Sequence, residues 1–170
     1  MMTSTWPPRL RDTRAVAKAY NEVLNWPIFL GPERLVPEQV EDAFADSTDL
    51  VVSTSCLSFD AISLSYSAGM DALVGVDRQV KSVPSLRVDH RAVTLLVAPG
   101  TGGAVADLAG VNVRAGERER IELPPAPGIR WDTPPWHIRE AKALGLPDAL
   151  ELRKVLTRSL TFYPAPGGER

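Results

Sequence analysis

Acidic, histidine and serine residues at a few positions could give this sequence chemical activity. Asp60 lies in an otherwise apolar run, where an ionised carboxylate is costly unless a cation or a metal ion meets its charge. It could pair with an arginine such as Arg130, or bind a metal ion together with Asp132. His90 and His137 lack the close spacing typical of metal ligands on one helix, so we favour the ion pair.

Two further patterns are typical of catalytic or phosphate-binding sites but are incomplete. Asp89-His90 has no Gly-x-Ser-x-Gly turn to accompany it, and we expect these residues in a solvated loop. The segment 100–103, Gly-Thr-Gly-Gly, follows an apolar run, but Ala104 stands where a phosphate-binding loop needs lysine. These glycines therefore predict a plain turn.

The segment Trp131-Asp132-Thr133-Pro134-Pro135-Trp136 places two indole rings around a rigid turn. Exposed rings in a turn can stack on bases or bind a protein partner. We expect Trp131 to close the edge of the core and Trp136 to be the contact residue. Basic side chains add further candidates for nucleic-acid contacts: Arg130, Arg153, Lys154 and Arg158.

The composition is that of an ordinary globular domain. The chain has 170 residues, of which 44% are hydrophobic and 24% charged. We expect one domain over residues 11–162, with flexible ends at 1–10 and 163–170. The net charge of -2 argues against nucleic-acid binding by bulk charge, so any such binding needs a local basic patch.

Cysteine content and hydropathy indicate the compartment. Cys56 is the only cysteine, which excludes an intrachain disulfide and a cage of thiolate metal ligands. We find neither a signal peptide nor an apolar run of membrane-spanning length. The sequence therefore predicts a cytoplasmic protein without a membrane partner.

Hydrophobic spacing predicts interleaved helices and strands. The expected helices begin near residues 12, 37, 67, 135 and 147, and the third buries Met70, Leu73 and Val74. The expected strands are 28–30, 50–52, 57–64, 92–97, 111–113, 118–123 and 129–131, with turns at 53–55 and 114–117. Because no strict strand–helix–strand repeat occurs, we predict an α+β fold with a mixed, largely antiparallel sheet flanked by helices.

Four segments, taken in order, resemble the N-terminal domains of bifunctional DNA primase–polymerases, in particular their short actinobacterial members. They are similar to the family patterns GWPVFP, FDxL, FLVxPGT and LPP…RWxxPP. In this chain they read Val23-Leu24-Asn25-Trp26-Pro27-Ile28-Phe29, Ser58-Phe59-Asp60-Ala61-Ile62, Leu95-Leu96-Val97-Ala98-Pro99-Gly100-Thr101 and residues 121–131. Together they cover about residues 13–136.

The resemblance implies an RRM-like primase–polymerase core and a link to DNA replication. In catalytic members an Asp-x-Asp pair, a histidine and a further acid hold two Mg²⁺ or Mn²⁺ ions for nucleotidyl transfer. The best match puts Ser63 and Ser65 at the acid positions and Val93 at the histidine position, three residues from His90. Serine hydroxyls do not carry the negative charge that these ions require, so the resemblance implies a degenerate member without cofactors.

Three hypotheses follow. The first is a catalytically inactive primase–polymerase-like domain that acts as a binding module for DNA or a nucleotide, or as a regulatory module. The second is a divergent nucleotidyltransferase that uses Asp60 with Asp132 or Asp89 and Mg²⁺ or Mn²⁺. The third is a protein–protein adaptor that contacts its partner through the turn 131–136 and the C-terminal helix.

Overall fold

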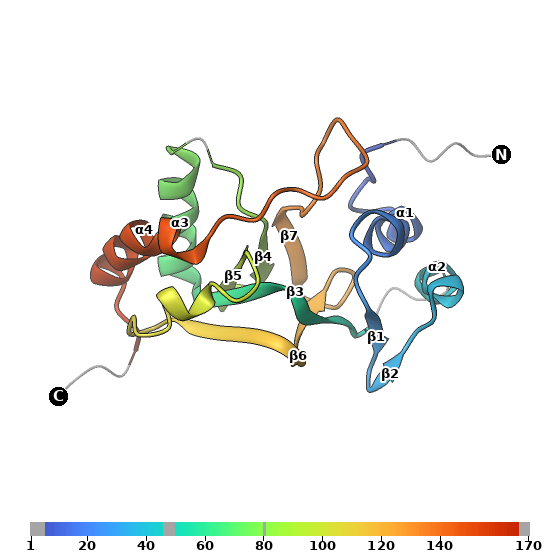
Figure 1. Cartoon of the computed structure of the whole chain (residues 1–170), viewed down its shortest axis with the longest axis horizontal. Coiled ribbons are helices and arrows are strands. Elements are labelled where there is room, and N and C mark those ends of the chain that lie inside the picture. Colours follow the sequence, from blue (N-terminus) through green and yellow to red (C-terminus); the bar gives the residue numbers. More distant parts are fainter. Residues whose placement is uncertain (1–5, 46–49, 80, 167–170) are drawn as a thin grey trace.

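A curled antiparallel sheet forms the centre of the computed structural model, which describes residues 6–45, 50–79 and 81–166 (Figure 1). The strands are β1 (Ile28–Leu30), β2 (Glu33–Arg34), β3 (Val52–Ser65), β4 (Ser85–Val88), β5 (Ala92–Val97), β6 (Asn112–Leu123) and β7 (Ile129–Thr133). The helices are α1 (Thr13–Lys18), its π-helical continuation η1 (Ala19–Val23), α2 (Pro37–Ala45), α3 (Tyr66–Asp77), the 3₁₀ turn η2 (Gly102–Ala104) and α4 (Ala149–Phe162). The predicted α+β class is confirmed, and every strand pairing in the described residues is antiparallel.

Strand β3 organises the sheet because it changes partners along its length. The order is β2-β1-β3-β5-β4-β7, and β6 also pairs with β3. Near Thr54, β3 pairs with β1 and with the end of β6; near Ser63, it pairs with β5 and with the start of β6. Register shifts between Ser55 and Ala61 mark the bend. Because irregular pairing bends a strand and increases its twist, the sheet curls around one of its faces.

Helices α3 and α4 cover the other face of the sheet. Side chains alternate along a strand, so Ile62, Val93 and Leu95 point together towards these helices. Packing is close: a Cβ on Gly69 of α3 would lie 2.4 Å from the Val93 Cβ, and one on Gly75 would lie 2.8 Å from a Val155 methyl group. Asp148 caps α4 and accepts a hydrogen bond from the Leu150 amide.

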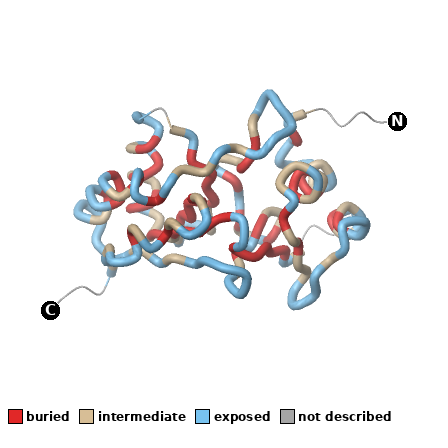
Figure 2. Tube along the Cα trace, viewed as in Figure 1, coloured by how far each residue is buried: buried red, intermediate tan, exposed pale blue. Residues whose placement is uncertain are grey.

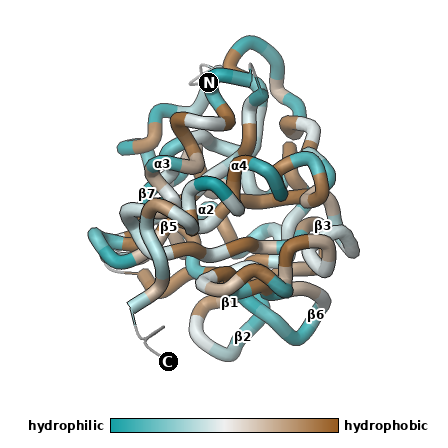
Figure 3. The backbone as a smooth tube through the Cα atoms, turned by 90° about the vertical axis from the view of Figure 1, so that its left-hand side faces the viewer, coloured by the Kyte–Doolittle hydropathy of each residue, from teal (hydrophilic) through white to brown (hydrophobic). Residues whose placement is uncertain are grey.

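A second core of aromatic rings joins α1, α2 and the segment before α4 to the sheet. Tyr20 is fully buried and contacts Trp26, Phe44, Trp131 and Trp136. Its hydroxyl accepts a hydrogen bond from Trp131 Nε1 at 2.8 Å and donates one to the Pro124 carbonyl at 3.0 Å. Burial raises the pKa of this hydroxyl. Buried segments follow the sheet and the inner sides of the helices (Figure 2), and hydrophobic residues gather in the same layer (Figure 3).

The structure corrects two predicted turns. Residues 53–55 are not a turn but part of β3, because Thr54 pairs on both edges, with Ile28 and with Ile121. Residues 114–117 are not a hairpin turn but part of β6, which follows β3 along its whole bend. Gly116, at φ +88°, pairs with Cys56 where the two strands change register. Pairing with neighbouring strands thus overrides the local turn preference.

Two helical predictions are also corrected. In α3 the buried residues are Ala68, Gly69, Ala72, Leu73 and Val76, while Val74 is exposed, because the close approach to β5 selects small side chains. Residues 134–145 form no helix but an irregular segment that a bridge between Trp136 and Ala143 closes. The consecutive prolines at 134 and 135 lack the N–H groups that a helix requires.

The packed domain begins before residue 11. Trp6 Nε1 donates a hydrogen bond to the His137 carbonyl at 2.8 Å, and its ring lies edge-on to Trp136. Pro8 is buried. At the other end Ala165 lies close to Gly110. The outer parts of the predicted flexible ends, residues 1–5 and 167–170, lie outside the described residues.

We predict that Tyr20→Phe lowers the free energy of unfolding by about 1–3 kcal/mol, because the buried Trp131 N–H loses its acceptor. Urea unfolding followed by fluorescence measures this change. Tyr163→Phe, at an exposed position, is the control and is expected to change stability by less than about 0.5 kcal/mol. Equal unfolding midpoints for the two variants would contradict the role assigned to the hydroxyl.

Candidate functional site: a pocket inside the curled sheet

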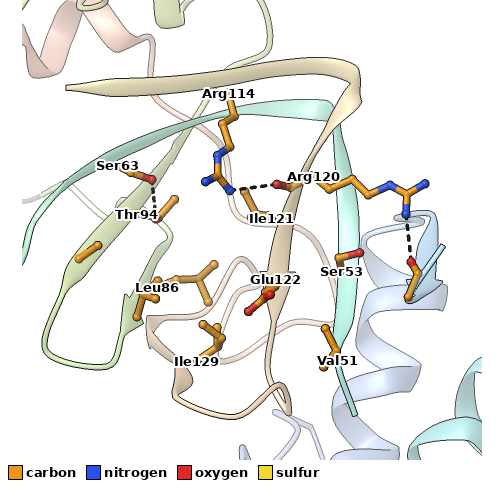
Figure 4. A pocket seen from close by; sticks show the side chains of 13 residues that line it. Val51, Ser53, Ser63, Leu86, Thr94, Arg114, Arg120, Ile121, Glu122 and Ile129 are labelled. Carbon is orange, nitrogen blue, oxygen red and sulfur yellow. Dashed lines mark hydrogen bonds between the residues drawn. The ribbon is translucent and has the colours of Figure 1, made fainter.

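A pocket of about 520 Å³ lies inside the curl of the sheet (Figure 4). Strands β3, β4, β5, β6 and β7 all contribute to its wall. The lining combines hydroxyl groups, guanidinium groups, one carboxylate and an apolar area: Ser53, Ser63, Thr94, Arg114, Arg120, Glu122, Leu86, Val88, Ile121 and Ile129. This size and mixture suit a small polar ligand.

The two serines at the predicted acid positions lie on the pocket face of β3. The Ser63 hydroxyl is hydrogen-bonded to the Thr94 hydroxyl of β5 at 2.8 Å, and both residues line the pocket. Ser65 lies two residues further on the same face, opposite Ala92. Val93 lies on the other face, fully buried against Gly69 of α3. The position that the resemblance gives to a histidine therefore does not face Ser63.

Two arginines of β6 line the pocket: Arg114 directs its guanidinium into it, whereas the guanidinium of Arg120 points away, towards Gly31 (Figure 4). Arg114 Nη1 donates a hydrogen bond to the Arg120 carbonyl at 3.2 Å, and Arg120 Nη1 donates one to the Gly31 carbonyl at 3.1 Å. The Arg120 guanidinium lies 3.6 Å from the ring centre of Phe29. A guanidinium carries five N–H donors, so Arg114 keeps donors for a ligand. In Figure 4 Arg114 extends into the pocket between Ser63 and the Arg120 carbonyl.

Sequence reasoning missed both arginines. Assigning residues 114–117 to a turn separated Arg114 from Arg120, although the structure places them in one strand. The signal was present in the alternation of charges through this segment, Arg-Ala-Gly-Glu-Arg-Glu-Arg over residues 114–120, which is typical of an exposed strand.

Asp60 points away from this pocket. It is buried, and its Oδ2 accepts a hydrogen bond from the Gly102 amide at 2.7 Å, at the start of η2. The predicted ion pair with Arg130 is wrong, because β7 lies at the far edge of the sheet from β3. A backbone amide and not a guanidinium satisfies this carboxylate.

Asp132, His90 and Arg130 share a second pocket, of about 460 Å³, together with Asp89 and Arg87. The Arg87 guanidinium pairs with Asp132, and Arg91 pairs with Asp89 at 3.2 Å. The His90 ring lies edge-on to Tyr66 of α3. The structure thus brings together Asp89, His90, Arg130 and Asp132 from the sequence-predicted residues but leaves Asp60 elsewhere.

The donors in the sheet pocket do not fit the pair of divalent ions that the resemblance implies. Glu122 is the one carboxylate among its described lining residues, and Ser63 and Thr94 offer neutral hydroxyls. Mg²⁺ and Mn²⁺ bind through carboxylate and phosphate oxygens, so a site for two such ions needs more than one carboxylate. Across the described ranges, no group of three or more His, Cys, Asp or Glu residues is placed to hold a metal ion. We therefore derive no metal-dependent step.

Both indoles of the turn 131–136 are buried. Trp131 is 6% exposed and closes the core, as predicted. Trp136 is only 3% exposed, so the prediction that it is the contact residue is wrong. The rings of Trp6, Tyr20 and Trp131 surround it. The buried Trp136 ring therefore does not provide the partner contact that the adaptor hypothesis requires.

The basic residues of α4 lie on its outer side, apart from both pockets. Arg153 forms a two-pronged ion pair with Asp107, with both N–O distances at 2.7 Å. These hydrogen bonds lower the pKa of Asp107 to about 2. Lys154 has no ion-pair partner within the described residues, and Arg158 lies 6.0 Å from the Phe162 ring. Of the four basic candidates, Arg153 is thus already engaged by a carboxylate.

Comparison with known proteins adds no assignment: no family model, curated protein or solved structure matches this chain. Among the described helices, none has the length and apolar character needed to cross a membrane.

We predict that Gly102→Ala destabilises the fold by about 1–3 kcal/mol, because the new Cβ would lie 2.6 Å from a Val113 methyl group and 3.0 Å from Asp60 Oδ2. Thermal unfolding measures the change. Gly103→Ala is the matched control, since a Cβ at this neighbouring position meets nothing within 4 Å. If both variants unfold like the unmodified protein, η2 does not hold Asp60 as described.

Proposed function

We propose that this chain binds a phosphate-bearing ligand, a nucleotide or single-stranded nucleic acid, in the pocket inside the curled sheet. The observation that carries the proposal is that Arg114 lines the same pocket as the hydroxyl groups of Ser63 and Thr94. Guanidinium and hydroxyl donors together suit the oxygens of a phosphate. The positive charge is local, which is compatible with a chain whose net charge is -2.

The resemblance to primase–polymerases supports the same ligand class. In that interpretation the chain descends from a replication domain whose acid positions became Ser63 and Ser65 and which retains ligand binding without polymerase activity. The pocket wall supports the binding part of this proposal, since Ser63 lies in it.

A divergent nucleotidyltransferase is the second candidate. One observation favours it: Asp89, His90 and Asp132 line one pocket. Two observations favour the binding module instead, because Asp60 lies apart from them and Asp132 is neutralised by Arg87.

We predict that Arg114→Ala weakens the binding of a fluorescein-labelled, mixed-sequence single-stranded DNA oligonucleotide about tenfold, because charge-assisted hydrogen bonds to phosphate are lost. Fluorescence anisotropy at low and at raised salt measures this. The slope of log affinity against log salt is expected to become shallower by about 0.7 for each phosphate contact removed. Competition by an unlabelled mononucleotide separates the two ligand sources, since displacement shows that the pocket accepts a nucleotide alone.

Arg118→Ala is the matched control for this experiment. Arg118 lies in the same strand and carries the same charge, but it is exposed and does not line the pocket. Equal loss of affinity in both variants, or no binding at low salt, would overturn the proposed site.

A further inference from the structure

Glu122 gives the sheet pocket a second, oppositely charged end. In Figure 4 its carboxylate lies on the pocket side of β6, near Leu86 and Ile129, while the Arg114 guanidinium lies near Ser63. Within the described part of the chain, Glu122 has no ion-pair partner. Its oxygens are therefore available to accept hydrogen bonds from a ligand.

The surface beside Glu122 is apolar. Leu86 is buried in β4, Ile129 is buried in β7, and Val88 continues the same face of β4. Leu86 and Ile129 close the floor of the pocket, and the half-buried Val88 offers an aliphatic surface on which a flat, weakly polar ring can pack. A nucleobase is such a ring, and its edge carries the hydrogen-bonding groups.

The separation of charges orients a nucleotide in the pocket. Its phosphate is attracted to the Arg114 end and repelled by the Glu122 carboxylate, so the base lies at the Glu122 end. A carboxylate has two acceptor oxygens and, when ionised, no donor. It is complementary to a base edge that presents two adjacent donors.

Guanine is the base with that edge, because its N1–H and exocyclic N2–H donors lie side by side. Adenine presents a donor beside an acceptor nitrogen, and cytosine does the same, so each would place a lone pair against a carboxylate oxygen. Hypoxanthine keeps the N1–H donor but lacks the exocyclic amino group.

We infer that the sheet pocket selects guanine nucleotides and that Glu122 is the residue that determines this specificity. The inference rests on the proposed function, because it takes the phosphate to lie at the Arg114 end. It goes further in assigning a base to the apolar side of the pocket.

Isothermal titration of the full chain with GMP, IMP and AMP tests this inference. We expect GMP to bind about tenfold more tightly than AMP, in keeping with the discrimination of a two-pronged contact to a base edge, with IMP between them. In Glu122→Gln, which replaces one acceptor oxygen with a donor, the preference for GMP over AMP is expected to vanish. A circular dichroism spectrum and an unfolding midpoint like those of the unmodified protein show that this variant is folded.

Glu119→Gln is the matched control, since Glu119 lies in the same exposed strand but does not line the pocket. It is expected to keep the preference for GMP. Equal affinities for GMP and AMP in the unmodified protein, or a preference that survives in Glu122→Gln, would overturn the inference and leave the proposed function standing. Failure of all three nucleotides and of the oligonucleotide to bind would overturn both.

Discussion

The bend in β3 is the constraint on which the rest of the structure depends. This strand pairs with β6 along one edge, while its other edge changes partner from β1 to β5. A flat sheet cannot meet these pairings, so the register shifts between Ser55 and Ala61 and the sheet curls. The curl creates a concave inner face, and the space enclosed by this face has to be occupied.

Two different fillings divide that inner face. At one end the rings of Tyr20, Trp26 and Trp131 occupy the space, and hydrogen bonds through the Tyr20 hydroxyl satisfy the polar atoms that burial would otherwise leave unpaired. At the other end the described lining residues include no aromatic ring, and Ser63, Thr94 and Arg114 lie beside an open pocket. The pocket is thus the part of the inner face that the aromatic core does not reach.

The outer face of the sheet is packed differently. Helices α3 and α4 cover it, and their close approach leaves room at Gly69 and Gly75 for no side chain. Asp60 belongs to this face, where the Gly102 amide holds its carboxylate. A carboxylate that stands out in the sequence as a catalytic candidate is thereby part of the packing between β3 and η2, while the polar groups of the pocket come from neighbouring residues on the inner face.

The sequence by itself determined the α+β class, most strand positions, and the starts of the helices near residues 12 and 37, because these depend on local spacing and on residues near one another in the chain. It also placed Trp131 in the core. Only the tertiary structure decided that residues 52–65 and 112–123 are single strands, because their hydrogen-bond partners come from distant segments. For the same reason, only the structure showed that Trp136 is buried and that Asp60 is bonded to the Gly102 amide instead of Arg130. It also showed that Arg114 and Glu122 line one pocket with Ser63. These contacts depend on which face of a strand each side chain occupies and on which strands are neighbours, and the local spacing of residues determines neither.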